Sequence, residues 1–188
     1  SPVVIGLAVA TMVVVALFTL GNSSNMFLLL RARELGLPQA QVPLLWAGVS
    51  AVAMVLSTPL SALSDRFGRM RLLLGGYLAY AAVYAALGWL THAGPGLFVV
   101  FAAYGVFLAA TEGVEKALVA DLAPAEGQGT AFGWFNLTAG LVLLPASVVF
   151  GALYQSAGPG AAFAFSGSCA LLAAGLLVGW VRPAMPAR

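Results

Sequence analysis

Three ionisable side chains stand close together inside a long apolar stretch of the chain. Glu112, Glu115 and Lys116 lie within the run 96–120, where each ionisable group costs about 3 kcal/mol in a membrane. Residues three and four apart share one face of a helix, so the three charges are neighbours. Two interpretations are open. Either the charges neutralise one another as part of a gate, or one glutamate, Glu112 as the deeper one, binds and releases a proton.

A second polar cluster interrupts the apolar run 3–30. Asn22, Ser24 and Asn25 carry amide and hydroxyl groups, which can hydrogen-bond either a substrate or a neighbouring helix. Polar and aromatic residues inside other runs are further candidates for the same cavity wall: Trp46, Tyr104, Thr111 and Asn136. Both uses of the amides stay open, as does a place for the aromatic residues in the interfacial belt of a membrane protein.

A short charged segment separates the apolar runs 41–63 and 71–91. It contains Asp65, Arg66, Gly68, Arg69 and Arg71. Arginines in a short loop hold that loop on the cytoplasmic side of a membrane, and a glycine permits a tight reversal between two helices. With six crossings, five arginines fall on the side of this loop and the two termini, against two on the other side. We therefore expect both termini to be cytoplasmic.

The composition predicts that membrane helices position these residues. The 188 residues are 62% hydrophobic and 7% charged, with a mean hydropathy of +1.01, which leaves too little polar surface for a soluble globule. Six apolar runs are each long enough to cross a bilayer as a helix: 3–30, 41–63, 71–91, 96–120, 130–155 and 160–181. We expect an all-α membrane protein, a single domain over residues 1–188, surrounded by lipid and without a nucleic-acid partner.

Small residues recur at helical spacing in several of these runs. Gly105 and Ala109 are four residues apart, as are Gly175 and Gly179. Small side chains let two helices approach closely inside a membrane, where no hydrophobic drive brings them together. We expect these pairs, together with Ala81 and Ala85, to mark faces on which helices pack.

The charged segment resembles the signature loop of the major facilitator superfamily. The pattern of that loop is glycine, three residues, an acid, a base, any residue, glycine, any residue and two bases. Four positions match it: Asp65, Arg66, Gly68 and Arg71. Ser61 and Met70 depart from it, which is the form usual in the second half of these transporters.

A second stretch extends the resemblance over nearly the whole chain. Residues 111–124, followed by 129–133, resemble the tenth helix and the loop into the eleventh in one prokaryotic group of the superfamily. Gln128 stands where these members often have a base, so we expect a contact of that base to be missing. The six helices would then be the seventh to twelfth of a transporter, a half-bundle built from two inverted three-helix repeats. The chain starts at Ser1 without a signal-peptide pattern, and we expect a trimmed product or a fragment.

The resemblance implies secondary active transport of small molecules by alternating access. The version we expect is proton-coupled export of amphiphilic compounds by an antiporter in a bacterial inner membrane. Asp65, Arg66 and Arg69 would exchange partners with the three charges of the run 96–120 as the transporter opens and closes. The partner would be the missing first half or a second copy of the chain in a homodimer, with a small-molecule substrate and protons as ligands.

Two other classes of function compete with transport as an interpretation of the sequence. A membrane module that binds a partner through exposed helix faces, without transport, stays open. An intramembrane protease needs a serine and a histidine that face each other, but the single histidine, His92, lies in a predicted loop. The single cysteine, Cys169, excludes an internal disulfide and a multi-cysteine metal site. We therefore expect no enzyme, no metal and no cofactor.

Overall fold

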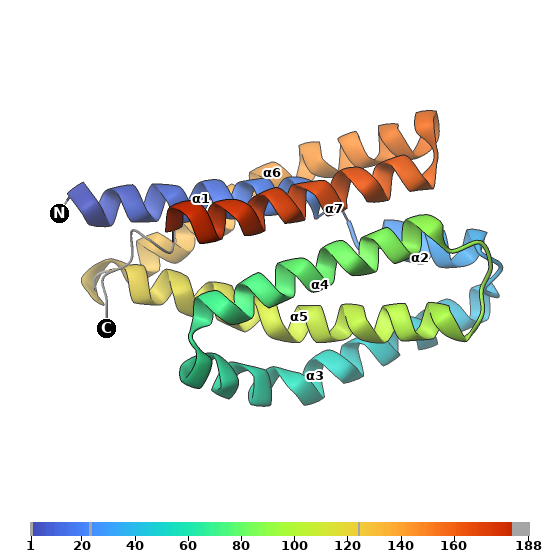
Figure 1. Cartoon of the computed structure of the whole chain (residues 1–188), viewed down its shortest axis with the longest axis horizontal. Helices are drawn as coiled ribbons and strands as arrows, with labels where there is room; N and C mark the ends of the chain where they lie inside the picture. The colour runs from blue at the N-terminus through green and yellow to red at the C-terminus, as the bar shows by residue number, and fades with distance from the viewer. Residues whose placement is uncertain (1, 23, 124, 182–188) are drawn as a thin grey trace.

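The computed structural model describes residues 2–22, 24–123 and 125–181, and every regular element among them is a helix. Arg182 and Arg188, which contribute to the predicted cytoplasmic location of the termini, lie outside the described residues. The α-helices are α1 Pro2–Gly21, α2 Met26–Glu34, α3 Val42–Phe67, α4 Arg69–Trp89, α5 Pro95–Leu122, α6 Gln128–Ala157 and α7 Pro159–Leu176 (Figure 1). Short turns complete them: η1 Gln39–Gln41, η2 Ala125–Gly127 and η3 Leu177–Val181.

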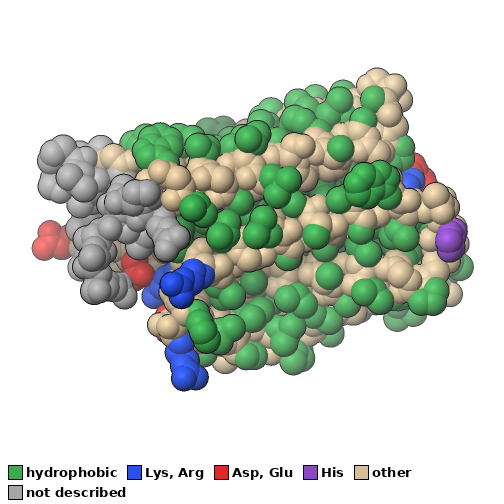
Figure 2. Space-filling model, viewed as in Figure 1, with side chains coloured by type: hydrophobic (Ala, Val, Ile, Leu, Met, Phe, Trp, Pro, Cys, Tyr) green, Lys and Arg blue, Asp and Glu red, His purple; other side chains and the backbone are tan. Residues whose placement is uncertain are grey.

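Six helical spans are long and apolar enough to cross a membrane, which confirms the predicted all-α membrane fold. On the face drawn in Figure 2, hydrophobic side chains cover the middle of the molecule and charged side chains gather at its two ends. We call proximal the end with the α3–α4 and α5–α6 connections, and distal the end with the α2–α3, α4–α5 and α6–α7 connections (Figure 1).

The helices pack in a pattern that repeats between the two halves of the chain. α3 packs against α5 and α6 packs against α1, while α4 lies against α5 and α7 lies against α1. α4 and α7 also pack against each other. The first three spans are α1 with α2, α3 and α4, and the last three are α5, α6 and α7. Exchanging the two sets in this order leaves the packing pattern unchanged, as expected for two inverted three-helix repeats.

Prolines and glycines set where the spans begin and reverse. α3, α5 and α7 each have a proline in the first turn, where the missing N–H has no intrahelical partner in any case. Gly68 has a φ of 91° between α3 and α4, and Gly158 has a φ of 86° between α6 and α7. A side chain would strain the backbone at both φ values.

The first span is two helices rather than the continuous helix predicted for the run 3–30. α1 ends at Gly21 and α2 begins at Met26. Polar side chains compete with the helical hydrogen bonds here, and other helices satisfy part of the freed backbone. The Tyr80 hydroxyl donates to the Gly21 carbonyl at 3.0 Å, and the Ser24 amide donates to Ser147 Oγ at 3.3 Å.

Of the two predicted pairs that contain glycine, only the one at Gly105 packs closely against another helix within the described part of the chain. A Cβ on Gly105 would lie 2.8 Å from the Val49 carbonyl oxygen, so α3 and α5 are in close contact there. A Cβ on Gly175 or Gly179 would meet nothing within 4 Å. The prediction for that second pair was wrong for this bundle, because spacing gives the face of a helix but not its neighbour.

Candidate functional site

Glu112 and Lys116 line a pocket on an exposed face of the bundle. Its volume is about 300 Å³, and it lies between α3 and α5. The lining residues are Ala53, Ser57, Leu108, Ala109, Glu112, Gly113 and Lys116. Glu112 and Lys116 are both exposed, and within the described part of the chain neither forms an ion pair in this conformation. No ion pair therefore joins these charges to one another among the described residues in this conformation.

Glu115 points into the bundle instead of into this pocket. Its Oε1 accepts a hydrogen bond of 3.0 Å from the Tyr77 hydroxyl on α4. The Tyr77 ring is fully buried and stacks on Phe18 of α1 with centroids 4.0 Å apart. Position along the helix had ranked Glu112 as the deeper carboxylate, but Glu115 is the more enclosed one, because the two residues face different neighbours.

The signature-loop residues lie at the proximal end, where Arg69 joins three helices. Its Nη2 lies 3.7 Å from Asp65 Oδ1 of α3, and its Nε lies 3.1 Å from Asp121 Oδ2 of α5. Arg66 and Arg71 are exposed. Asp121 is not among the residues predicted for this site. Its position near the cytoplasmic end of the predicted fourth span, the same side as the three arginines, could have indicated it.

Tertiary packing gathers part of the predicted cavity wall beside the break between α1 and α2. The Tyr104 hydroxyl of α5 donates a hydrogen bond of 2.7 Å to Asn25 Oδ1. The ring of Trp46 from α3 lies 6.4 Å from the Tyr104 ring. Asn22 Oδ1 is buried and has no hydrogen-bond partner among the described residues. The interrupted span, α3 and α5 thus bring amide, phenol and indole groups together.

Two other predicted cavity residues lie apart from this cluster. Thr111 is buried and donates to the Phe107 carbonyl at 2.9 Å, and its methyl group fills the space left by Gly76 of α4. Asn136 is exposed on α6 and donates to the Phe132 carbonyl at 2.9 Å. In this conformation each side chain donates its hydrogen bond to a backbone carbonyl of its own helix, as polar residues in apolar helices often do.

Comparison with known proteins gives two similarities. A family model described as the Major Facilitator Superfamily matches residues 6–188. Over 169 residues the chain is 34% identical to an uncharacterized MFS-type transporter of Methanocaldococcus jannaschii. The alignment covers 87% of this chain and 42% of that relative, so the chain spans less than half of the relative's length.

Proposed function

Because the chain belongs to the major facilitator superfamily, we propose that it forms one half of a secondary transporter for small molecules. The observation that carries this proposal is the charged pocket between α3 and α5. Glu112 and Lys116 are exposed on a span whose surroundings are otherwise apolar, and lipid would not hydrate them. A second bundle that covers the pocket would enclose both charges near a midplane site, which is the arrangement alternating access requires.

The burial of the spans supports a second bundle on one side. α3 and α6 bury 11% and 17% of the residues in their apolar windows, against 44% for α4 and 50% for α5 and α7. The least buried spans, α3 and α6, are equivalent in the two repeats, as expected if each repeat contributes one helix to the contact with a second bundle. The partner is the missing first half or a second copy of the chain, related by a twofold axis along the membrane normal.

We assign proton coupling to the cluster of Glu112, Glu115 and Lys116. The ionisable groups that face Glu115 are Tyr77 from α4 and the other two members of the cluster from α5. Glu112 opens toward the pocket while Glu115 is enclosed, so one carboxylate can meet substrate and the other can hold a proton away from it. Loss of hydration favours the neutral form of a carboxyl group, and this is the physical reason for placing the proton site in this cluster.

The pocket lining favours amphiphilic substrates. Ala53, Leu108 and Ala109 supply apolar wall, and Glu112 with Lys116 supplies charge at one side. A proximal end on the cytoplasmic side would follow the positive-inside rule, since the arginines of the α3–α4 connection lie there. In this orientation the first and last described residues, Pro2 and Val181, would lie on the cytoplasmic side. We further propose that the transporter is an antiporter that exports its substrate across a bacterial inner membrane.

Proteoliposomes with an imposed pH gradient test this function, with ethidium as an amphiphilic cationic probe. We expect the intact protein to accumulate ethidium against its gradient, and Glu112→Gln to reduce the initial rate at least tenfold. Glu126→Gln is the matched control, because this acid is exposed in η2 and does not line the pocket. Ethidium flux that ignores the pH gradient would contradict proton coupling, and full flux in Glu112→Gln would remove the pocket from the mechanism.

A further inference from the structure

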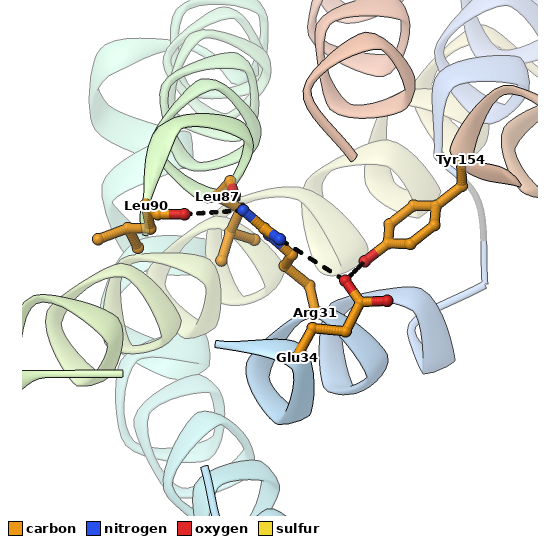
Figure 3. Close-up of polar contacts among 5 residues, drawn as sticks. All are labelled: Arg31, Glu34, Leu87, Leu90 and Tyr154. Carbon is orange, nitrogen blue, oxygen red and sulfur yellow. Dashed lines mark hydrogen bonds and ion pairs between the residues drawn. The ribbon is translucent and has the colours of Figure 1, made fainter. Parts of the chain in front are cut away.

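Acids and bases that are neighbours on a helix form ion pairs at the ends of the bundle. At the distal end, Arg31 Nη1 lies 3.6 Å from Glu34 Oε2 (Figure 3). Arg31 also donates to the Leu87 carbonyl at 3.1 Å and to the Leu90 carbonyl at 2.7 Å. The Tyr154 hydroxyl donates a hydrogen bond to Glu34. Both charges at this end thus have partners within the chain.

Glu112 and Lys116 have the spacing of an ion pair but do not form one. Asp65 and Arg69 are also four positions apart with the acid first, and their charged groups lie 3.7 Å apart. This order and spacing favours pairing on a helix. Glu112 and Lys116 share both features, yet neither has an ion pair or a hydrogen bond among the described residues. Since both side chains line the charged pocket, each charge is available to a ligand there.

An apolar pocket lies on the same seam between α3 and α5, closer to the distal end. Its volume is about 320 Å³, and apolar side chains from both helices line it: Leu44, Val49, Val52, Phe98 and Phe101. Gln41 is the polar residue in this lining. The two pockets adjoin, because Val52 lines the apolar pocket and the next residue, Ala53, lines the charged one. A single elongated molecule along the seam can therefore reach both pockets.

We propose that the two pockets bind one zwitterionic amphiphile, with its alkyl chain in the apolar pocket, its cationic group at Glu112 and its anionic group at Lys116. This inference rests on the proposed transport function and names the class of substrate. α5 runs from Pro95 at the distal end to Leu122 at the proximal end, so Glu112 lies nearer the apolar pocket than Lys116 does. The cation of the substrate must therefore lie between its alkyl chain and its anion, as in a betaine.

A zwitterion is the ligand that gives both charges of the pocket a partner. Cβ atoms four positions apart on a helix are separated by roughly 6 Å, which the short linker of a betaine can match. A singly charged amphiphile would leave Glu112 or Lys116 without a partner on an apolar span, where an unpaired charge is costly. Ethidium carries only a cationic group and would use the Glu112 side alone.

Calorimetric titration of the intact protein in nanodiscs tests the proposal, with decyl betaine as the zwitterionic probe. Decylphosphocholine has the same chain but carries its anion next to the chain, and decyltrimethylammonium has no anion. Empty nanodiscs correct for partition of each probe into lipid. We expect decyl betaine to bind at least tenfold more tightly than either of the other probes. Equal affinities for the three probes would overturn the proposal.

Two charge variants test the assignment of each charge. Glu112→Lys combined with Lys116→Glu reverses the order of the charges along the seam, and we expect decylphosphocholine then to bind at least tenfold more tightly than decyl betaine. Lys116→Gln removes the partner of the anion, so decyl betaine should lose its advantage over decyltrimethylammonium. A charge-reversed variant that keeps the preference of the unmodified protein would contradict the assigned orientation.

A glycine variant tests the place of the alkyl chain. Gly48 lines the apolar pocket, and a Cβ there meets nothing within 4 Å, so Gly48→Leu should fill the pocket without a clash. We expect it to weaken decyl betaine at least tenfold and to leave trimethylglycine, which lacks the chain, unaffected. Gly140→Leu is the matched control, because Gly140 is an exposed helical glycine of α6 that also has no neighbour within 4 Å. Equal losses in the two variants would overturn the placement of the chain.

Ethidium flux under a pH gradient is a separate readout of the proposed function. A protein that transports ethidium but shows no preference for decyl betaine would overturn this inference and leave the transport function standing. A protein that prefers decyl betaine but moves no ethidium would support the binding site and contradict proton-coupled transport of a cation. The two failures are therefore distinguishable.

Discussion

At the residue scale, the paired charges of the chain lie at the ends of the bundle. Arg69 reaches both Asp65 and Asp121 at the proximal end, and Arg31 pairs with Glu34 at the distal end. Ion pairs this close to water contribute roughly 0–1 kcal/mol to stability. Their value to the molecule therefore lies in choosing between conformations, since a contact made in only one state shifts the balance between states.

The Arg69–Asp121 pair gives a prediction for the proximal end. We expect Arg69→Ala and Asp121→Asn each to slow ethidium transport at least tenfold while the melting temperature changes little, because a partly exposed pair contributes little to folding. Transport rates and thermal unfolding in detergent measure the two effects. The double variant serves as the control: it should be no slower than the worse single variant, since both changes remove the same contact. Additive losses would show that the two residues act separately.

At the element scale, close helix contacts depend on a few glycines. At Gly105 the obstacle to a larger side chain is the Val49 backbone, which cannot turn aside as a flexible side chain can. At Gly76 a Cβ would clash with the Thr111 methyl group. The α3–α5 and α4–α5 contacts are therefore set by small residues in α5 and α4 that meet backbone or branched side chains.

Substitution of Gly105 tests this account of the packing. Gly105→Ala should lower the free energy of unfolding by about 1–3 kcal/mol, because the added methyl group forces α3 and α5 apart. Gly175→Ala is the matched control, since it is also a helical glycine but has no neighbour within 4 Å. We expect it to be neutral or slightly stabilising. Denaturant titration in detergent micelles measures both variants, and equal losses would contradict the close-contact explanation.

At the scale of the whole molecule, exposed apolar side chains lie both on the proposed contact face and on spans outside it. Met54 on α3 is 73% exposed and Leu172 on α7 is 61% exposed, although both lie on apolar spans. In the proposed transporter the first would be covered by a second bundle, while the second would face lipid. The two side chains are similar in size and exposure within this chain, so they form a matched pair of reporters.

Accessibility of spin labels to oxygen, which dissolves in lipid, tests for the second bundle. In a Cys169→Ala background we expect a label at position 54 to be protected from oxygen and one at position 172 to be accessible in nanodiscs. Native mass spectrometry then distinguishes a first half from a second copy of the chain. Equal accessibility at the two positions, together with a monomer mass and full transport, would contradict the proposal of two bundles.

The sequence alone determined the fold class, the number of spans and the location of the main charged cluster. Apolar runs and short polar breaks suffice for this, because a bilayer requires every spanning segment to satisfy its own backbone hydrogen bonds. The loop from Asp65 to Arg71 and the stretch that begins at Thr111 also indicated the superfamily, which the family comparison confirmed.

Only the tertiary structure decided which polar groups meet. Helix spacing placed Glu112 and Glu115 on neighbouring positions, but rotation of α5 against α4 put one in an open pocket and the other against Tyr77. The contact between Glu34 and Tyr154 joins residues separated by 120 positions, and no local pattern encodes it. Periodicity fixes the face that a residue occupies on its own helix, whereas its partner depends on the packing of all the helices together.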